Sequence, residues 1–330
     1  MLKFCGSSSP RPLEKQWASP PLPTHHVPMN SAPPATGVRL DWEALPASVR
    51  DAVAGILGAP VVRAVTQRGG FSPGVAARVV TRRGKRGFVK AVSGDVNSFS
   101  PVLHRQEARN AAALPREVPA PELLGVHDDG NWVALVFEDV DGRQPHVPWR
   151  AGELRVVLDA VGELGRVLTP APFDAPSAAE DLADAFGGWP ELVEQGFPVL
   201  QRADGWEEAV RGDTLAHGDL RADNVLLAGD TDRVWFVDWP HVTRAAPWFD
   251  LLLLLPSVRA QGGPDPETVF TEHPLGRRAD QDAVTVALAA LAGYFLGHAG
   301  RPAPPGLPTL RPFQQAQGDA ALEWLRTRVR

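Results

Sequence analysis

LAHGDLRADNVLL, residues 215–227, is the stretch from which we predict the fold of this 330-residue chain. It places His217, Asp219 and Asn224 at the spacing H-x-D-x-x-x-x-N, and the short segment VWFVD ends at Asp238 soon afterwards. Phosphoryl transfer needs a carboxylate that orients an attacking hydroxyl, together with an amide and a second carboxylate that hold Mg²⁺ on the phosphates. The spacing therefore predicts Asp219 as the base and Asn224 and Asp238 as metal ligands.

The same letters have a second interpretation. Asp, Gly and Asn are common turn residues, so HGD followed by an Asp-Asn pair can simply shape a loop before the strand NVLLA. Short motifs also produce false matches. The rest of the sequence has to separate a catalytic segment from an ordinary turn.

Composition indicates a soluble globular protein, with 44% hydrophobic and 22% charged residues. The single cysteine excludes a disulfide framework and favours a cytoplasmic location. No apolar run reaches the ~18 residues of a membrane span, and the longest, Ala283 to Leu296, fits a buried helix better. We therefore predict no membrane, nucleic-acid or protein partner.

The net charge of −6 divides unevenly, with +5 in residues 1–150 and −11 in residues 151–330. This division suits an anionic ligand at one end of the molecule and a cationic ligand at the other. An uneven but merely solvated surface explains it equally well.

Residues 1–37 are rich in Pro and Ser and show no apolar periodicity, so we expect a disordered tail. A helix is predicted over residues 45–57, followed by the strand PVVRAVTQ. The next segment, RGGFSPGVA, holds the candidate phosphate-loop residues Gly69, Gly70, Phe71, Ser72 and Gly74. Glycines let a backbone approach a polyphosphate closely, although a plain hairpin fits this segment as well.

Lys90 lies inside the apolar strand FVKAV, where an ammonium group needs an anionic partner. The expected partner is Glu107, on the helix HRQEARNAAAL. A strand lysine that is paired with a helix glutamate and reaches the α- and β-phosphates is the arrangement that kinases use. Beyond the buried strand Trp132 to Phe137, Glu138 to Val140 have backbone groups that can pair with an adenine edge, or they form a simple linker.

The second half is predicted to be mainly helical, with core helices over residues 151–168, 280–296 and 315–328. Residues 174–213 are acidic and form a candidate lid or acceptor-binding insert, unless they are solvated helix faces. A hairpin of NVLLA and RVWFV should bring Asn224 and Asp238 together. Asp250, just before an apolar helix, is expected to support the catalytic loop rather than take part in chemistry.

Taken together, residues 45 to about 328 resemble the aminoglycoside phosphotransferase family, within the protein-kinase-like fold, and HGDLRADN with Asp238 behind it carries the strongest match. The resemblance implies an α+β, bilobal fold: a small lobe, residues 38–140, with a five-stranded antiparallel sheet and one helix, and a larger, mainly helical lobe, residues 141–330. ATP is expected in the cleft between them, with Mg²⁺.

The resemblance also implies roles for single residues. By motif position, Asp219 resembles the catalytic base, Asn224 and Asp238 resemble the magnesium ligands, and Lys90 and Glu107 resemble the ion pair that positions the phosphates. The segment Gly69 to Gly74 resembles the loop over the nucleotide, although it lacks the spacing G-x-G-x-x-G.

Arg221 departs from the family pattern, which usually has His or Ser at this position. It stands two residues after Asp219, and its guanidinium group is a candidate to contact the transferring phosphate.

A short gap excludes a protein kinase. Only 11 residues separate Asp238 from Asp250, too few for an activation segment with its A-P-E closure. The predicted function is ATP-dependent O-phosphorylation of a small hydroxylated molecule, of the aminoglycoside type found in antibiotic resistance. Alternatives are another antibiotic class, a metabolite kinase of the choline, sugar or homoserine type, and a nucleotide-binding pseudo-enzyme; the acidic second half leans toward a cationic acceptor.

Overall fold

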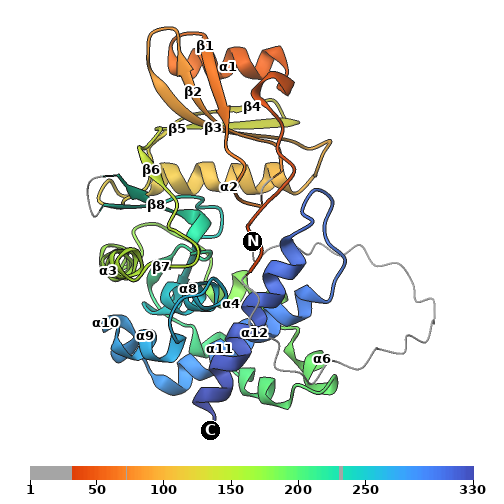
Figure 1. The fold of residues 1–330 in the computed structure, drawn as a ribbon, viewed down its shortest axis with the longest axis vertical. Helices are drawn as coiled ribbons and strands as arrows, with labels where there is room; N and C mark the ends of the chain where they lie inside the picture. The colour runs from red at the N-terminus through yellow and green to blue at the C-terminus, as the bar shows by residue number, and fades with distance from the viewer. Residues whose placement is uncertain (1–31, 72, 230–232) are drawn as a thin grey trace, which may run out of the picture.

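The computed structural model describes residues 32–71, 73–229 and 233–330. The chain forms two lobes, with an antiparallel sheet in the small lobe and mainly helices in the larger lobe (Figure 1). This is the architecture predicted from the sequence.

The sheet of the small lobe is antiparallel throughout, in the order β1-β2-β3-β5-β4. Its five strands are β1 (Val61–Thr66), β2 (Val75–Thr81), β3 (Arg86–Ser93), β4 (Leu123–Asp128) and β5 (Trp132–Phe137). The short 3-10 helix η1 (Trp42–Ala44) precedes the sheet.

Helices cover both faces of this sheet, α1 (Ala47–Leu57) on one and α2 (Ser100–Ala113) on the other. The alternation of side chains along β5 decides which face each residue joins. Ala134 and Val136 belong to the cluster with α1, whereas Val133, Leu135 and Phe137 face Ala108 and Ala111 of α2. The resemblance implied one helix in this lobe; α1 is a second, which the apolar spacing over residues 45–57 predicts.

The larger lobe begins where β6 pairs with β8, soon after β5 leaves the first sheet. Its strands are β6 (Gly142–Arg143), β7 (Thr214–Ala216), β8 (Val225–Ala228), β9 (Val234–Phe236) and β10 (Thr243–Ala245). Its helices are α3 (Ala151–Val167), α4 (Ala178–Asp181), α5 (Ala183–Phe186), α6 (Trp189–Glu194), η2 (Pro198–Ala203), α7 (Trp206–Ala209), η3 (Ala222–Asn224), α8 (Phe249–Ala260), α9 (Pro266–Glu272), α10 (Pro274–Arg277), α11 (Gln281–Ala299) and α12 (Leu310–Arg328).

Helix α11 is the central helix of this lobe and packs against α12, η2 and α7. In the described part of the chain it is the one helix long and apolar enough to cross a membrane. Because its Leu288 and Leu291 are completely buried within the protein core, its apolar character is explained by packing.

The predicted tail and the last helix differ from the structure at their boundaries. Residues 32–37 are placed between the lobes: Ala32 donates to the carbonyl of Ala260 at 2.8 Å, and Gly70 donates to that of Ala35 at 3.0 Å. The prediction of disorder is therefore wrong for this segment, because its backbone groups find partners in both lobes; residues 1–31 lie outside the described residues. Helix α12 begins at Leu310, earlier than the predicted Gln315.

His104 of α2 predicts an acid sensitivity of the fold. Burial, reinforced by the charge of Lys90, lowers the pKa of His104 from 6.5 to about 3. Between these two pH values the unfolded chain binds a proton that the folded chain does not, so stability should fall as the pH falls, by roughly 1.4 kcal/mol per pH unit from this group. Urea unfolding between pH 7 and 4.5 should show a smaller pH dependence in His104→Leu than in the wild type; equal slopes would contradict the assignment.

Candidate active site

Asp250 fixes the backbone of the loop that follows β7. Its carboxylate, in the first turn of α8, accepts hydrogen bonds from the backbone N–H groups of His217 at 2.8 Å and Gly218 at 3.0 Å. Burial raises the pKa of Asp250, and these two N–H groups act in the opposite direction. Asp250 thus supports the backbone of this loop, as expected.

Gly218 occupies a position that requires glycine. Its φ is +78°, and a Cβ atom there would overlap the backbone carbonyl of His241. His241 lies opposite Gly218 because β7 and β10 pair through Ala216 and Thr243. The close approach of two backbones therefore explains why this position of the HGD motif is a glycine.

His217 connects this loop to the end of β9. Its Nε2–H donates to the carbonyl of Val237 at 3.0 Å, and its Nδ1 accepts from the backbone N–H of Asp219 at 3.3 Å. Burial lowers the pKa of His217, which agrees with this neutral tautomer. Its ring also packs on Trp239 with centroids 4.4 Å apart, so the histidine of the motif has a structural role.

Asp219 is held by the guanidinium group of Arg221. Arg221 Nη1 donates to Asp219 Oδ1, while Nε and Nη2 donate to the carboxylate of Asp223, both at 3.0 Å. Burial favours the neutral form of Asp219, but the surrounding positive charges, of which Arg221 is the largest, together outweigh burial and hold the pKa of Asp219 below its usual value. Asp219 is therefore a carboxylate able to accept a proton.

Asn224 and Asp238 lie at the open end of the hairpin formed by β8 and β9. Val225 pairs with Phe236, and the backbone N–H of Val237 donates to the carbonyl of Asn224 at 3.0 Å. The side-chain Nδ2 of Asn224 donates to the backbone carbonyl of Asp219 at 2.8 Å, which leaves the amide oxygen as its metal-binding atom. Asp238 is the only described non-glycine residue with a positive φ, 73°, a strained conformation of the kind found at functional sites.

These two side chains suit Mg²⁺. They offer one amide oxygen and one carboxylate, and Mg²⁺ prefers few protein oxygens because it keeps waters and substrate phosphates as its other ligands. No cluster of three or more His, Cys, Asp or Glu residues that would hold a metal by itself occurs among the described residues.

Lys90 joins the two lobes. Its Nζ lies 2.6 Å from Glu107 Oε2 on α2 and also forms an ion pair with Asp238 of the larger lobe. Burial alone would lower the pKa of Lys90, but the two carboxylates outweigh it and raise the pKa. At Asp238, burial alone would raise the pKa of the carboxyl group, but the charge of Lys90 and its hydrogen bond act in the opposite direction, and the pKa is lowered.

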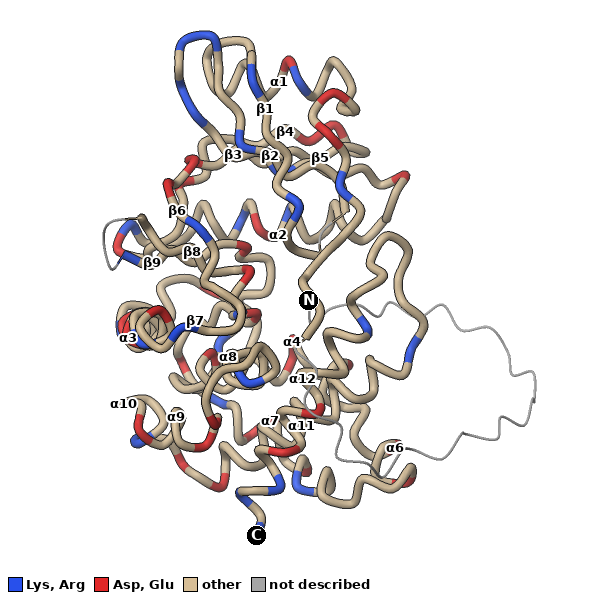
Figure 2. The backbone as a smooth tube through the Cα atoms, viewed as in Figure 1, with Lys and Arg blue, Asp and Glu red and all other residues tan. Residues whose placement is uncertain are grey.

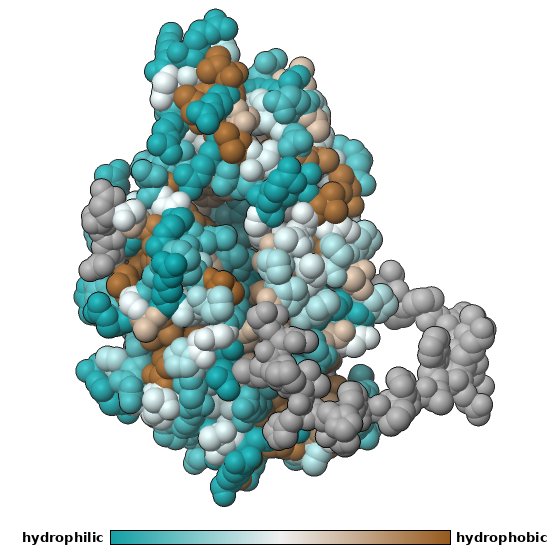
Figure 3. Space-filling model, in the orientation of Figure 1, coloured by the Kyte–Doolittle hydropathy of each residue, from teal (hydrophilic) through white to brown (hydrophobic). Residues whose placement is uncertain are grey.

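A cavity of about 500 Å³ lies between the lobes, and Figure 3 shows the hollow. It has the size expected of a small-molecule site. Most of the predicted cofactor and metal residues line it, namely Gly69, Gly70, Lys90, Glu107, Glu138, Val140, Asn224 and Asp238. The backbone N–H of Glu138 donates to the carbonyl of Glu122 at 2.8 Å. Of the two backbone groups of Glu138, only the carbonyl is therefore available to pair with an adenine edge.

Two predicted cofactor residues do not line this cavity. Gly74, with φ +100°, lets the loop pass close to the backbone of Ala91, and this packing explains its glycine. Phe71 packs against Phe313 of α12, with ring centroids 5.0 Å apart. Ser72 lies outside the described residues.

Arg39 is a cavity residue that the sequence did not reveal. It lines the cavity, donates from Nη2 to the carbonyl of Gly69, and lies close enough to Asp238 and Asp223 for their charges to raise its pKa, although burial lowers that pKa more strongly. It belongs to an irregular segment without a motif, so no local pattern pointed to it. Gln144 was also missed; its Nε2 donates to the carbonyl of Asp223 at 3.2 Å.

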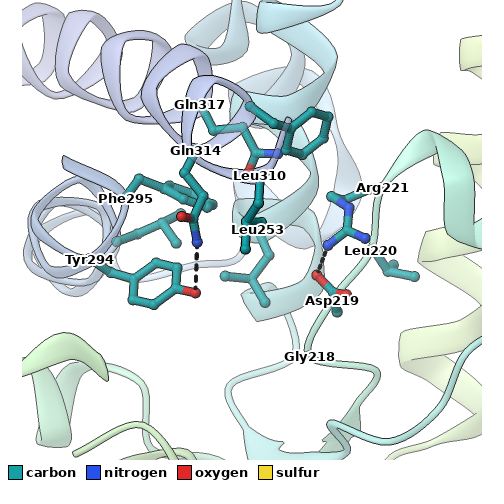
Figure 4. A pocket seen from close by; sticks show the side chains of 12 residues that line it. Gly218, Asp219, Leu220, Arg221, Leu253, Tyr294, Phe295, Leu310, Gln314 and Gln317 are labelled. Atoms are coloured by element: carbon teal, nitrogen blue, oxygen red, sulfur yellow. Dashed lines mark hydrogen bonds and ion pairs between the residues drawn. The ribbon is translucent and has the colours of Figure 1, made fainter. Parts of the chain in front are cut away.

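A second cavity of about 30 Å³ lies on the other side of the loop, and Figure 4 shows Asp219 and Arg221 in its wall with Tyr294, Gln314 and Gln317. Asp219 lines this smaller cavity and not the larger one, whereas Asn224 and Asp238 line only the larger one. The catalytic loop thus separates two spaces, one beside the metal ligands and one beside the predicted base.

The acidic residues 174–213 contribute to neither of these two cavities. The segment is anchored by Phe186 and Trp206, whose rings meet edge-on at 5.1 Å, and Phe186 also contacts Tyr294 of α11. Figure 2 shows acidic residues spread over the helices of the larger lobe. The carboxylates of this insert are therefore surface groups, in line with the alternative of solvated helix faces.

A model of the family described as phosphotransferase enzyme family matches residues 70–302. No curated protein sequence matches the chain significantly. Among solved structures, the aminoglycoside phosphotransferase APH(4)-Ia in a ternary complex with ADP and hygromycin B has a TM-score of 0.56 at 14% identity, over 84% of this chain and 98% of that chain.

Two structures of other kinases are also similar. A putative fructosamine-3-kinase from Haemophilus somnus 129PT has a TM-score of 0.51 at 11% identity, over 82% of this chain and 96% of that chain. An ethanolamine kinase from Plasmodium vivax has a TM-score of 0.50 at 10% identity, over 77% and 81% of the two chains. These similarities confirm the predicted kinase-like fold, and at such identities they do not select an acceptor.

Gly218→Ala should disrupt the loop, and Gly84→Ala is a matched control. Both glycines have φ near +80°, but a Cβ at Gly84 meets nothing within 4 Å. The control should therefore lose only the ~1–2 kcal/mol of a left-handed alanine, while Gly218→Ala should lose more because the backbone of His241 must also move. Urea unfolding measures both; equal losses would contradict the role of the close approach.

Proposed function

We propose, starting from the fact that this chain belongs to the phosphotransferase enzyme family, that it uses ATP and Mg²⁺ to phosphorylate a hydroxyl group of a small molecule. The observation that carries the proposal is the catalytic loop between two cavities, with Asp219 facing one and Asn224 and Asp238 facing the other. A hydroxyl beside Asp219 and a phosphate chain beside the metal ligands would meet at this loop.

The transfer step follows from these positions. The acceptor oxygen forms a bond to the γ-phosphorus, the bond from that phosphorus to the β–γ bridging oxygen breaks, and ADP leaves with that oxygen. The hydroxyl proton goes to Asp219, which Arg221 keeps ionised. Mg²⁺, held by Asn224 and Asp238, would neutralise charge on the phosphates.

Lys90 has a second task in this scheme. Its ammonium is fixed by Glu107 at 2.6 Å, so it is already oriented toward the cavity and can contact the phosphates without a search through side-chain conformations. Arg39 is a further positive group at the same wall. Both support the assignment of the larger cavity to a polyanionic nucleotide.

Several acceptors remain candidates. Structural neighbours include an enzyme complexed with hygromycin B and an ethanolamine kinase, so an aminoglycoside, another antibiotic class and a small metabolite of the choline, sugar or homoserine type are all retained. A pseudo-enzyme is disfavoured because Lys90, Glu107, Asp219, Asn224 and Asp238 are all present and brought together. We place the protein in the cytoplasm, on the basis of its single cysteine.

The proposal predicts acceptor-dependent ADP release from MgATP in a panel of aminoglycosides and hydroxylated metabolites. Asp219→Asn should lower turnover by 10²-fold or more, within the ~10²–10⁴-fold range of general-base catalysis. The same variant should still bind ATP by calorimetry, because Asp219 does not line the larger cavity. Turnover retained in Asp219→Asn, or no compound that stimulates ADP release, would contradict the proposal.

Arg221 predicts a shift in the pH profile. Without its charge the pKa of the buried Asp219 should rise, so the base form is lost at a higher pH and the acid limb of kcat/KM moves upward. Arg221→Ala should show this shift and at least about tenfold lower kcat/KM, equivalent to one pKa unit of interaction. Arg221→Lys retains the charge but loses the fork to Asp223, so its acid limb should lie closer to that of the wild type. Unchanged turnover in Arg221→Ala would exclude both this role and contact with the transferring phosphate.

A further inference from the structure

The smaller cavity identifies where an acceptor hydroxyl must lie. A hydroxyl that transfers its proton to Asp219 has to contact that carboxylate. Of the two cavities, Asp219 lines only the smaller one. The chemistry of the remaining wall therefore bears on the class of acceptor. The inference below rests on the proposed function.

The wall of this cavity is nearly neutral. Among the described residues that line it, Asp219 and Arg221 are the only charged ones, and they are paired with each other. Leucine and aromatic side chains from α8, α11 and α12 supply most of the remainder, including Leu253, Phe295 and Leu310 (Figure 4). A polycation would leave its ammonium groups against apolar surface without carboxylates to offset the loss of hydration, which is strongly unfavourable.

Gln317 of α12 has a polar group with no hydrogen-bond partner in the described part of the chain. Its side chain lines the cavity, the residue is only 2% exposed, and its Nε2 forms no hydrogen bond. Buried polar groups are almost always paired, and leaving a donor unpaired destabilises a fold. An unpaired amide in the wall of a ligand site is therefore explained if the ligand supplies the partner.

Gln314, one helical turn earlier, provides the contrast. It lines the same cavity, but its Oε1 accepts from Arg311 at 2.7 Å and its Nε2 lies 3.5 Å from the hydroxyl of Tyr294. Both glutamines line this cavity, but they differ in hydrogen bonding. Both polar atoms of the Gln314 side chain have partners, whereas Nε2 of Gln317 has none among the described residues.

The glycine loop packs against one residue of this cavity's wall, Phe313. A volume of about 30 Å³ holds roughly two water molecules. Phe71 of the glycine loop rests on Phe313, and the guanidinium carbon of Arg221 lies 5.7 Å from each ring centroid.

We propose that the acceptor is an uncharged, largely apolar alcohol whose hydroxyl contacts Asp219 while a second oxygen of the molecule, a carbonyl or ether, accepts a hydrogen bond from Gln317. The hydroxyl oxygen takes the γ-phosphoryl group, its proton passes to Asp219, and ADP is released. A polycationic acceptor does not fit this wall.

Three small alcohols test the charge preference: cyclohexanol, 4-hydroxycyclohexanone and trans-4-aminocyclohexanol, which is cationic at pH 7. With full-length protein and MgATP, kcat/KM for ADP release should be at least about tenfold higher for both neutral alcohols than for the amine. A preference for the amine, or for hygromycin B over the neutral alcohols, overturns this inference and leaves the proposed phosphotransfer standing. If none of the four compounds is phosphorylated while another member of the aminoglycoside and metabolite panel is, this inference fails and the proposed phosphotransfer stands; both fail only if no compound stimulates ADP release.

Gln317→Leu tests the hydrogen bond. It should reduce kcat/KM for 4-hydroxycyclohexanone about tenfold more than for cyclohexanol, because only the ketone has a second oxygen. Gln315→Leu is the matched control: it makes the same change on the exposed face of α12, outside the cavity, and should alter neither value. An equal effect of Gln317→Leu on the two alcohols would overturn the assigned contact.

A melting measurement separates this effect from damage to the fold. Removal of a buried unpaired donor should leave Gln317→Leu melting at or above the wild-type temperature. A lower melting temperature would mean that Gln317 has a partner within the protein, which would overturn the basis of the inference.

Discussion

The ammonium group of Lys90 connects the two lobes at the candidate active site. A buried ammonium is strongly unfavourable unless carboxylates surround it, and removal of one partner from such a pair typically destabilises a protein by about 3–5 kcal/mol. Lys90 takes one partner from each lobe, Glu107 from the small lobe and Asp238 from the larger one. The relative placement of β3, α2 and the end of β9 therefore depends on this charge, and so does the wall of the larger cavity.

The catalytic loop is held by a second set of contacts that starts from Asp250. Its carboxylate fixes the backbone at His217 and Gly218, and His217 in turn donates to the carbonyl of Val237, next to Asp238. The predicted base and the predicted metal ligands thus share one rigid support, although they face different cavities. Such a support can hold the acceptor oxygen and the γ-phosphorus at the contact distance that transfer requires, because Asn224 Nδ2 lies only 3.3 Å from Asp219 Oδ2.

Local patterns predicted the parts of this site that depend on neighbouring residues. The apolar strand around Lys90, the helical spacing of Glu107 and the motif with Asp219 and Asn224 all have short-range signatures, and the structure brings Lys90 to Glu107 and Asp219 to Asn224. Contacts across long distances had no such signature. Arg39 reaches the cavity from an irregular segment, and Gln317 becomes special only because α12 packs beside the loop. The two interpretations of the acidic residues 174–213 stayed open in the sequence for the same reason, since charge along a sequence does not say which face it occupies.

One isotopic measurement directly tests transfer of the phosphoryl group to the hydroxyl oxygen of an acceptor. If Asp219 activates the hydroxyl of an acceptor, then the oxygen of that hydroxyl must form the new bond to phosphorus. Incubation of the full-length protein with MgATP and ¹⁸O-labelled cyclohexanol, followed by mass spectrometry, should give cyclohexyl phosphate that retains the label in its bridging oxygen. An unlabelled ester, or inorganic phosphate as the only product, would contradict the account.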